Sequence, residues 1–384
     1  MIPYGRQDIT DADIEAVRNV LCSDFITQGP EIPAFENALA EVCGAAHAVA
    51  VNSATAALHL ACAALDLGPG DWLWTSPNTF VASANAGRYC GASVDFVDID
   101  PRTYNLCPEA LERKLAAAER EGRLPKIVMP VHFAGQSCDM ARIGELGRRY
   151  GFRIVEDASH AVGGSYGEER VGGCRHSDIA VFSFHPVKII TTAEGGMALT
   201  NDPELAERMA LLRSHGITRA PERMRNGSEG PWYYEQVGLG FNYRMTDIQA
   251  ALGRSQLERL DSYVDARHTV RARYDAELAD LPLILPHQAD FQRSAVHLYP
   301  VLIRDEAPVD RAEAFARLRA LGINVNVLYI PVYRQPFHQG FGYRPEDFPV
   351  SEDYYRRTIA IPMFATLSAA DQGRVVASLH EAMS

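Results

Sequence analysis

Short apolar runs alternate with helical patterns between about Ala46 and Thr200, and this alternation limits the possible folds more than any other feature of the chain. The apolar runs are bounded by turn residues, such as those from Gly68 to Asp71, and therefore indicate buried strands. Strand, helix and strand repeated at this interval require crossover connections, which produce a mostly parallel sheet with helices on both faces. The sequence predicts an α/β protein whose ligands bind at the carboxyl ends of the strands.

The strands and helices expected in this region alternate along the chain. Strands are expected at His47 to Val51, Trp72 to Thr75, Val94 to Val97, Ile127 to Val131, Arg153 to Val155 and Ala180 to Phe184. Helices are expected between them at Thr55 to Leu65, Phe80 to Tyr89, Pro108 to Ala118 and Met140 to Tyr150.

The pattern changes after Thr200, where longer helices are expected at Pro203 to Ser214 and from Thr246 to about Ala276. The polar segment 218–231 between them is too long for a tight connection, so it is either an active-site loop or a disordered insertion. A smaller α+β unit then follows, with its elements expected at Val296 to Ile303, Arg311 to Leu321, Val325 to Ile330 and in a last helix from Ser368.

These patterns predict two domains. We expect a large domain over residues 1–255 and a small C-terminal α+β domain over residues 256–384. An N-terminal segment of about 20 residues can pack against the small domain, since chain termini lie at domain surfaces.

Charge and composition exclude several classes of protein. Acidic residues number 49 against 37 basic ones, with no run of lysine or arginine, so a nucleic-acid surface is not expected. A small phosphorylated ligand remains compatible with this charge, because backbone amides can hold a phosphate. We expect no metal site, since the seven cysteines are scattered without a CxxC pair. The sequence has no apolar leader pattern and no membrane-spanning stretch, which favours a cytoplasmic protein without a membrane partner.

Two residues in the stretch from Ile154 to Thr200 carry the most chemical information. Asp157 follows a buried strand, and Lys188 lies in a turn after a second strand, between the apolar runs of FSFHPV and II. Desolvation in such surroundings lowers the pKa of an amine and makes it able to form a Schiff base. A carboxylate at a strand end can pair with a protonated ring nitrogen. Together the two residues are the anchors of a pyridoxal phosphate (PLP) site.

Each residue taken alone also has an ordinary structural role. An aspartate at a strand end commonly caps a helix, and a lysine in a loop is usually solvated. The segment Asn52 to Leu58 favours the PLP site over these roles, because small residues there lead from a strand directly into a helix whose free amides can hold a phosphate.

At this point the sequence resembles a known family, the DegT-type sugar-nucleotide aminotransferases, which are PLP enzymes of fold type I, the aspartate aminotransferase fold. The resemblance extends from IPYGRQDI and ITQGPEIPAFE through EDASHA, FSFHPVK and TTAEGGM to GFNYRMTDIQAALG. FSFHPVK, TTAEGG and PWYYE are most similar to the branch of the pseudaminic acid pathway. The resemblance to that branch implies amination at C4 of a UDP-linked 4-keto-6-deoxy-N-acetylhexosamine, with L-glutamate as the amino donor.

The resemblance also implies roles for single residues. Lys188 would form the Schiff base with PLP, and Asp157 would pair with the pyridine nitrogen. The other cofactor contacts implied are stacking by Phe80, a polar contact of His160 near the phenolic oxygen, and phosphate contacts by Ala54, Thr55 and Ser183. Asn242 matches a phosphate contact supplied by a neighbouring subunit, which implies a homodimer with shared active sites.

Substrate contacts are implied in the same way. The matching residues are Tyr4, Thr27, Gln28, Gly29, His185 and Tyr329. Some relatives that remove water or oxygen carry histidine at the lysine position. His185 lies three residues before Lys188, so we interpret it as a neighbour that faces the substrate or packs.

Two other functions stay open from the sequence. One is an aminotransferase for a different nucleotide sugar, such as a GDP- or dTDP-linked 4-keto sugar, because the motifs fix the chemistry better than the base. The other is a non-catalytic regulator or scaffold with a PLP fold. The presence of Lys188, Asp157 and the phosphate segment favours an enzyme.

Overall fold

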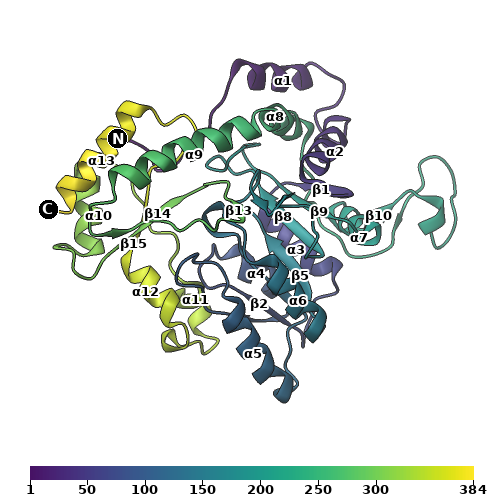
Figure 1. Cartoon of the computed structure of the whole chain (residues 1–384). Helices are drawn as coiled ribbons and strands as arrows, with labels where there is room; N and C mark the ends of the chain where they lie inside the picture. The colour runs from purple at the N-terminus through teal and green to yellow at the C-terminus, as the bar shows by residue number, and fades with distance from the viewer.

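A computed structural model describes residues 1–384, and a seven-stranded sheet forms its centre (Figure 1). The strands follow the order β1 (His47–Val51), β9 (Gly196–Thr200), β8 (Ile179–Ser183), β5 (Arg153–Asp157), β4 (Ile127–Met129), β2 (Trp72–Thr75) and β3 (Ser93–Phe96). Strand β9 runs antiparallel to both of its neighbours, and the other strands are parallel to one another. The predicted α/β fold with a mostly parallel sheet is confirmed.

Helices cover both faces of this sheet, as the alternation of its buried side chains requires. On one face, Leu73, Val155 and Val181 pack in a cluster with the helices α3 (Ala54–Ala64), α4 (Ala82–Tyr89) and α7 (Pro203–Arg213). On the other face, Trp74 and Ile154 pack against α5 (Pro108–Glu121) and α6 (Met140–Tyr150). Further along that face, strands β8 and β9 contact α2 (Glu31–Cys43) and α8 (Asp247–Leu257).

Two expectations for the large unit were wrong. Strand β9 was not expected, although all five of its residues are buried, because an antiparallel strand inserted between parallel ones leaves no distinct sequence pattern. The helix expected from Thr246 to about Ala276 is two helices, α8 and α9 (Leu260–Glu277), separated at Glu258 and Arg259. The break redirects the chain, and Arg259 Nη2 there donates to both oxygens of the Asp13 carboxylate of α1 (Asp11–Leu21), each at 2.7 Å.

The C-terminal part forms a smaller antiparallel sheet of β12 (Leu283–Ile284), β14 (Tyr299–Ile303) and β15 (Thr358–Ile361). The helices α10 (Arg311–Ala320) and α13 (Ala369–Ala382) pack with this sheet in one cluster. The short helices between the large unit and β15 are η3 (Val332–Arg334), α11 (Pro336–Gln339), η4 (Pro345–Asp347) and α12 (Pro349–Arg357). Val332, Tyr333 and Phe348 of this segment pack in a cluster of the large unit.

The apolar stretch Val325 to Ile330 does not form the expected strand. It makes one isolated bridge, between Asn326 and Ala360. Beyond that point the backbone leaves the small sheet, because the Tyr329 amide donates to Asn78 Oδ1 of the large unit (3.3 Å).

The predicted division at residue 255 stays a prediction. Helix α9 contributes Val264 to a cluster of the large unit and Tyr274 to the cluster of the small one. At the N-terminus, Ile2 packs in the small cluster and forms a bridge with Ile323, whereas α1 lies on α8. Both chain termini lie beside α13 in Figure 1.

The polar segment 218–231 belongs to an arm that projects from the body of the molecule (Figure 1). Strands β10 (Ile217–Thr218) and β11 (Glu235–Gln236) form its base, and the short helix η2 (Pro221–Arg223) lies within it. The Glu235 carboxylate accepts the amides of Arg225 and Asn226 and the Tyr233 hydroxyl, so one side chain closes the loop.

The remaining elements are short. A small sheet consists of β13 (Gln292–Arg293), β6 (Ser165–Tyr166) and β7 (Glu169–Arg170), and the turn η1 spans Phe133–Gly135. None of the helices combines the length and the apolar character that a membrane crossing requires.

Candidate active site

A cavity of about 470 Å³ lies at the carboxyl ends of β5 and β8 and contains Lys188 and Asp157. Eight other residues predicted for the site also line it, namely Tyr4, Ala54, Thr55, Phe80, His160, Ser183, His185 and Tyr329. Larger hollows of about 1010 and 800 Å³ lie at the β3 edge and beside α12, but neither contains Lys188 or Asp157. The chemistry predicted from the sequence therefore selects the smaller cavity.

Asp157 is the last residue of β5 and is 5% exposed. Ser83 Oγ donates to its Oδ2 at 2.6 Å, and the Ser159 amide donates to its Oδ1 at 3.2 Å. Hydrogen bonds from two donors fix the orientation of a buried carboxyl group. The site thus holds the Asp157 side chain at a defined position on the cavity wall.

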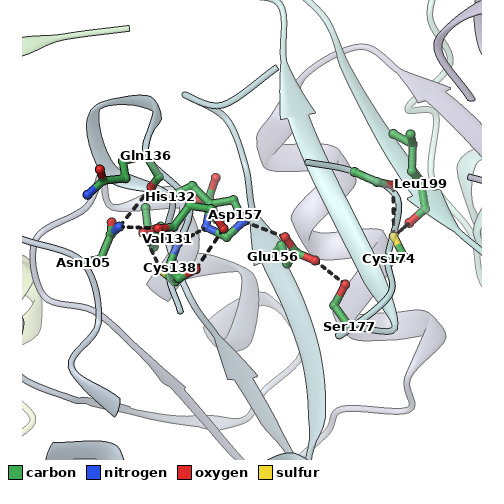
Figure 2. Close-up of polar contacts among 12 residues, drawn as sticks. Asn105, Val131, His132, Gln136, Cys138, Glu156, Asp157, Cys174, Ser177 and Leu199 are labelled. Atoms are coloured by element: carbon green, nitrogen blue, oxygen red, sulfur yellow. Dashed lines mark hydrogen bonds and ion pairs between the residues drawn. The ribbon is translucent and has the colours of Figure 1, made fainter. Parts of the chain in front are cut away.

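The strand behind Asp157 is fixed from the opposite face of the sheet. Glu156 points away from the cavity. Its carboxylate accepts a hydrogen bond from His132 Nε2 at 2.6 Å and another from the Ser177 hydroxyl (Figure 2). His132 Nδ1 in turn accepts the Cys138 amide at 3.1 Å. These contacts tie the end of β5 to the connections on either side of it.

Lys188 lies in the turn between β8 and β9, and its amide donates to the His185 carbonyl at 2.9 Å. Burial lowers the pKa of its amine to about 8, and the nearby Asp157 carboxylate opposes part of that decrease. At such a pKa roughly a tenth of the amine is unprotonated at pH 7, far more than in an ordinary lysine, and the unprotonated form is the one that attacks a carbonyl.

The first turn of α3 forms a polar floor next to these two groups. Ser53 caps the helix by accepting the Ala56 amide, so the amides of Ala54 and Thr55 remain free of intrahelical partners and lie at the cavity. Gly196 of β9 packs directly behind this turn, and a Cβ there would lie 2.5 Å from Ala54 N. A free helix N-terminus of this kind binds phosphate.

The opposite wall consists of aromatic and imidazole rings. Phe80 is 59% exposed beside the cavity, although it is a large apolar residue. His160 Nε2 lies 3.1 Å from the Tyr329 hydroxyl. Burial raises the pKa of Tyr4, which lines the cavity from the N-terminal segment.

These residues fit PLP on their chemistry. The cavity offers an amine with a lowered pKa, a hydrogen-bonded carboxylate, free amides at a helix N-terminus and an exposed aromatic ring. These are the groups that a Schiff base, a pyridinium nitrogen, a phosphate and a planar ring require.

Four residues predicted for the site do not line this cavity. Thr27 forms a bridge with Thr246, and the Gly29 amide donates to Asp247 Oδ2 at 2.8 Å. Asn242 pairs with Ser214 and is exposed. Thr27, Gln28 and Gly29 thus lie beside the start of α8, and Asn242 lies at the end of α7; all four are outside the chain's own cavity.

Sequence reasoning also missed residues that the structure places at the site. Ser53, Thr79, Ser159 and Glu194 line the cavity, and Ser83 holds Asp157 from α4. Ser159 and Glu194 stand within the motifs EDASHA and TTAEGG and could have been found there. Ser83 is 74 positions from Asp157, and no local pattern relates the two.

Comparisons with known proteins identify the family of the chain. The sequence profile of the DegT/DnrJ/EryC1/StrS aminotransferase family matches residues 7–380. The chain is 39% identical over 384 residues to the spore coat polysaccharide biosynthesis protein SpsC of Bacillus subtilis, covering 99% of this chain and 96% of SpsC.

Two further relatives have names that specify a nucleotide sugar. A UDP-4-amino-4,6-dideoxy-N-acetyl-beta-L-altrosamine transaminase of Campylobacter jejuni is 36% identical, over 97% of this chain and 94% of its own. A GDP-perosamine synthase of Caulobacter vibrioides is 39% identical, over 92% of this chain and 91% of its own.

The fold has close matches among solved structures. Helicobacter pylori PseC, an aminotransferase involved in pseudaminic acid biosynthesis, matches with a TM-score of 0.91 and 32% identity, over 100% of this chain and 99% of PseC. Sequence, fold and cavity thus lead to one conclusion. The chain belongs to the DegT/DnrJ/EryC1/StrS family and is a PLP-dependent sugar aminotransferase of fold type I.

Proposed function

We propose that this enzyme transfers the amino group of L-glutamate to C4 of a UDP-linked 4-keto-6-deoxy-N-acetylhexosamine. The product would be a UDP-4-amino-4,6-dideoxy sugar of the pseudaminic acid type. The observation that carries the reaction type is the meeting of Lys188, Asp157 and the α3 amides in one cavity. The sugar is supported by the Campylobacter relative and by the fit to PseC.

When bound, PLP carries the amino group between the two substrates and accepts the negative charge that develops when a proton leaves carbon. Asp157 would hold a proton at the pyridine nitrogen, and Ser83 and Ser159 keep its carboxylate in place for that task. The amides of Ala54 and Thr55, together with Ser183, would bind the phosphate. Phe80 would lie against the ring, and His160 would lie on the phenolic-oxygen side.

Lys188 has two tasks in this proposal. Its amine would hold the cofactor and, when free, would take the proton from the α-carbon of glutamate. In the second half of the reaction it would return a proton to C4 of the sugar. A pKa of about 8 suits both directions, because the amine gains and loses a proton near neutral pH.

Four predicted site residues lie outside the chain's own cavity, and this supports a proposal of shared sites. We propose that Asn242 and the loop of Thr27, Gln28 and Gly29 reach the site of a second copy in a homodimer. Large apolar side chains are exposed on this loop and on the arm, including Phe25 (55%) and Trp232 (71%). Such exposure is typical of surfaces that another chain covers.

A GDP-linked 4-keto sugar is the second candidate substrate. The observation in its favour is the 39% identity to the GDP-perosamine synthase, which is not lower than the identity to the UDP-sugar relative. The proposed chemistry at Lys188 and Asp157 is the same for both sugars. The difference would lie in the residues that contact the base.

An assay with purified enzyme tests the proposal. Glutamate is supplied with UDP-, GDP- and dTDP-linked 4-keto-6-deoxy sugars in parallel, and the products are identified by NMR. We expect the highest kcat/KM for the UDP-linked N-acetylhexosamine and an amine at C4. Preference for the GDP sugar would establish the second candidate, and absence of amination with every sugar would contradict both.

Two variants test the roles of Lys188 and Asp157 in the same assay. Lys188→Ala should abolish amination and the borohydride-reducible absorbance while the protein remains folded. Asp157→Asn should lower the rate by orders of magnitude, since a neutral amide does not hold the pyridinium proton. Wild-type turnover in either variant would contradict its assigned role.

A further inference from the structure

His160 joins the two structural units at the cavity. The Ala134 amide of the large unit donates to His160 Nδ1 at 3.3 Å. On the other side of the ring, His160 Nε2 lies 3.1 Å from the hydroxyl of Tyr329, which belongs to the C-terminal part. The rings of His160 and Tyr329 are nearly parallel, with an interplanar angle of 18°. The Ala134 amide, the His160 ring and the Tyr329 hydroxyl therefore form a chain of polar contacts that ends at the cavity.

The amide determines where the imidazole carries its proton. A backbone N–H can only donate, so Nδ1 must present a lone pair to Ala134. A neutral imidazole has one N–H, which then lies on Nε2 and points at the Tyr329 oxygen. The tyrosine oxygen is the acceptor in that bond. Its own proton is left free to point elsewhere.

The amide itself cannot turn away from His160. Ala134 adopts a left-handed conformation, with φ of 57° and ψ of 6°, inside the turn η1. Its carbonyl accepts the His297 amide at 2.9 Å, and the preceding Phe133 amide donates to Asn105 Oδ1 at 2.8 Å. Figure 2 shows Asn105 beside this connection. The donor that faces His160 is thus held from both sides.

The surroundings keep the His160 ring neutral and the Tyr329 phenol protonated, as this chain of hydrogen bonds requires. Burial and the Lys188 amine hold the pKa of His160 well below its usual range, so the ring is neutral. Burial and the Asp157 carboxylate raise the pKa of Tyr329, so the phenol keeps its proton. Tyr329 lines the same cavity as Lys188.

We propose that the Ala134 amide holds His160 in its neutral, Nε2-protonated form, and that His160 thereby turns the Tyr329 hydroxyl into a hydrogen-bond donor to an oxygen atom of the molecule bound in the cavity. This inference rests on the proposed function for the nature of that oxygen. The family resemblance places His160 near the phenolic oxygen of PLP. In this chain its Nε2 is directed at Tyr329, so the direct donor to the ligand is the tyrosine, and His160 is a positioning residue.

Two oxygen acceptors belong beside Lys188 in the proposed reaction. One is the phenolic oxygen of PLP, and the other is the C4 carbonyl oxygen of the keto sugar. Both accept a hydrogen bond from a phenol, and a donor at the carbonyl would polarise it toward attack by an amine. Experiments with and without the sugar distinguish the PLP oxygen from the sugar oxygen as the acceptor.

Nitrogen-15 NMR of the PLP-bound enzyme tests the tautomer directly, with His160→Gln to assign the signals. We expect a neutral ring protonated at Nε2 across about pH 6 to 8, where an ordinary histidine changes its charge. A ring protonated at Nδ1, or an imidazolium at pH 6, would overturn the proposal. The measurement needs no substrate, so its result does not depend on which sugar the enzyme uses.

Tyr329→Phe tests the donor, with Tyr355→Phe as its control. Tyr355 is half-buried at the end of α12 and lies outside the cavity, so its variant should behave as wild type. A changed visible spectrum of Tyr329→Phe without sugar would identify the PLP oxygen. A normal spectrum and glutamate half-reaction, with at least about a tenfold slower sugar half-reaction, would identify the keto oxygen. If neither changes, the hydroxyl donates to neither oxygen and the proposal fails.

Rescue separates positioning from mere packing. In His160→Gln one side-chain amide offers both an acceptor for Ala134 and a donor for Tyr329, whereas His160→Leu offers neither. We expect the glutamine variant to keep most of the activity that the leucine variant loses, at similar melting temperatures. Equal losses in both variants would show that the donor and acceptor pattern is irrelevant. Failure of the UDP-sugar proposal would appear instead as absent turnover in the wild type.

Discussion

At the scale of single residues, the pKa of Lys188 and the orientation of Asp157 depend on their immediate neighbours. Burial acts on the lysine amine, and two hydrogen-bond donors act on the aspartate. The sequence predicted both residues because each stands in a recognisable motif. It could not predict Ser83 or the Ala134 amide, because those contacts depend on tertiary packing between distant segments.

The buried amine makes the PLP-free protein less stable in a pH-dependent way. A decrease of the Lys188 pKa from 10.5 to about 8 corresponds to roughly 3 kcal/mol of lost stability. The whole loss is present below pH 8, where the amine is protonated in both the folded and the unfolded chain. It fades as the pH rises and disappears above about 10.5.

Lys188→Met should therefore stabilise the PLP-free protein at neutral pH. We expect an increase of up to roughly 3 kcal/mol in the free energy of unfolding at pH 7, which shrinks steadily toward pH 10. Urea denaturation at several pH values measures this. An increase in the free energy of unfolding that stays constant with pH would show that methionine acts by packing and not by removing a buried charge.

Ser83→Ala should impair catalysis through Asp157. The variant removes a 2.6 Å hydrogen bond to a buried carboxylate, which is worth about 1.5 to 3 kcal/mol and corresponds to roughly a 10- to 100-fold lower kcat. Ser351→Ala is a matched control, since Ser351 is also buried and donates to Asp98 at 2.6 Å outside the cavity. Steady-state kinetics compare the two, and equal rates would mean that Ser83 only packs.

At the scale of elements, the position of the α3 cradle, the free amides of Ala54 and Thr55 in the first turn of α3, depends on β9, a strand that sequence patterns did not reveal. Periodicity predicted β1, β2, β5 and β8 within a few residues, because buried parallel strands give continuous apolar runs. It missed β9 and extended one helix across the break between α8 and α9. Both errors concern the order and direction of packing, which local patterns do not encode.

Gly196→Ala should weaken cofactor binding without unfolding the protein. A Cβ on β9 would lie 2.6 Å from Ser53 C and 2.5 Å from Ala54 N, so the first turn of α3 must shift. We expect at least about a tenfold weaker PLP affinity, because misplaced amides no longer converge on the phosphate. Absorbance titration of the PLP-free protein measures the affinity.

Gly68→Ala is the control for that substitution. Nothing lies within 4 Å of a Cβ at Gly68, and its backbone does not have a positive φ. The two variants should melt within a few degrees of each other in the PLP-free form. If Gly196→Ala binds PLP as tightly as Gly68→Ala does, the cradle tolerates the added methyl group and the argument from packing is wrong.

At the scale of the whole molecule, the predicted site residues fall into two groups. One group lines the cavity. The other lies outside it, where Thr27 pairs with Thr246 at the start of α8 and Asn242 pairs with Ser214 at the end of α7. Both groups were predicted from motifs, and the match at Asn242 implied a dimer, but the motifs do not give the arrangement of the two copies. A two-fold dimer would bring the second group of each chain to the first group of its partner.

Complementation tests this arrangement. Lys188→Ala and Asn242→Trp subunits, each inactive alone, are mixed, unfolded and refolded together. If Asn242 reaches the partner's site, one site of a hybrid dimer collects both lesions and the other collects neither. Each hybrid should then regain up to half of the wild-type activity, measured in the amination assay after separation of tagged hybrids. Mixtures of Lys188→Ala with Asp157→Asn are the control, since both lesions lie in the chain's own cavity and each hybrid site keeps one of them. Hybrids of Lys188→Ala with Asn242→Trp that form but stay inactive would place Asn242 at its own subunit's site and contradict the shared-site dimer.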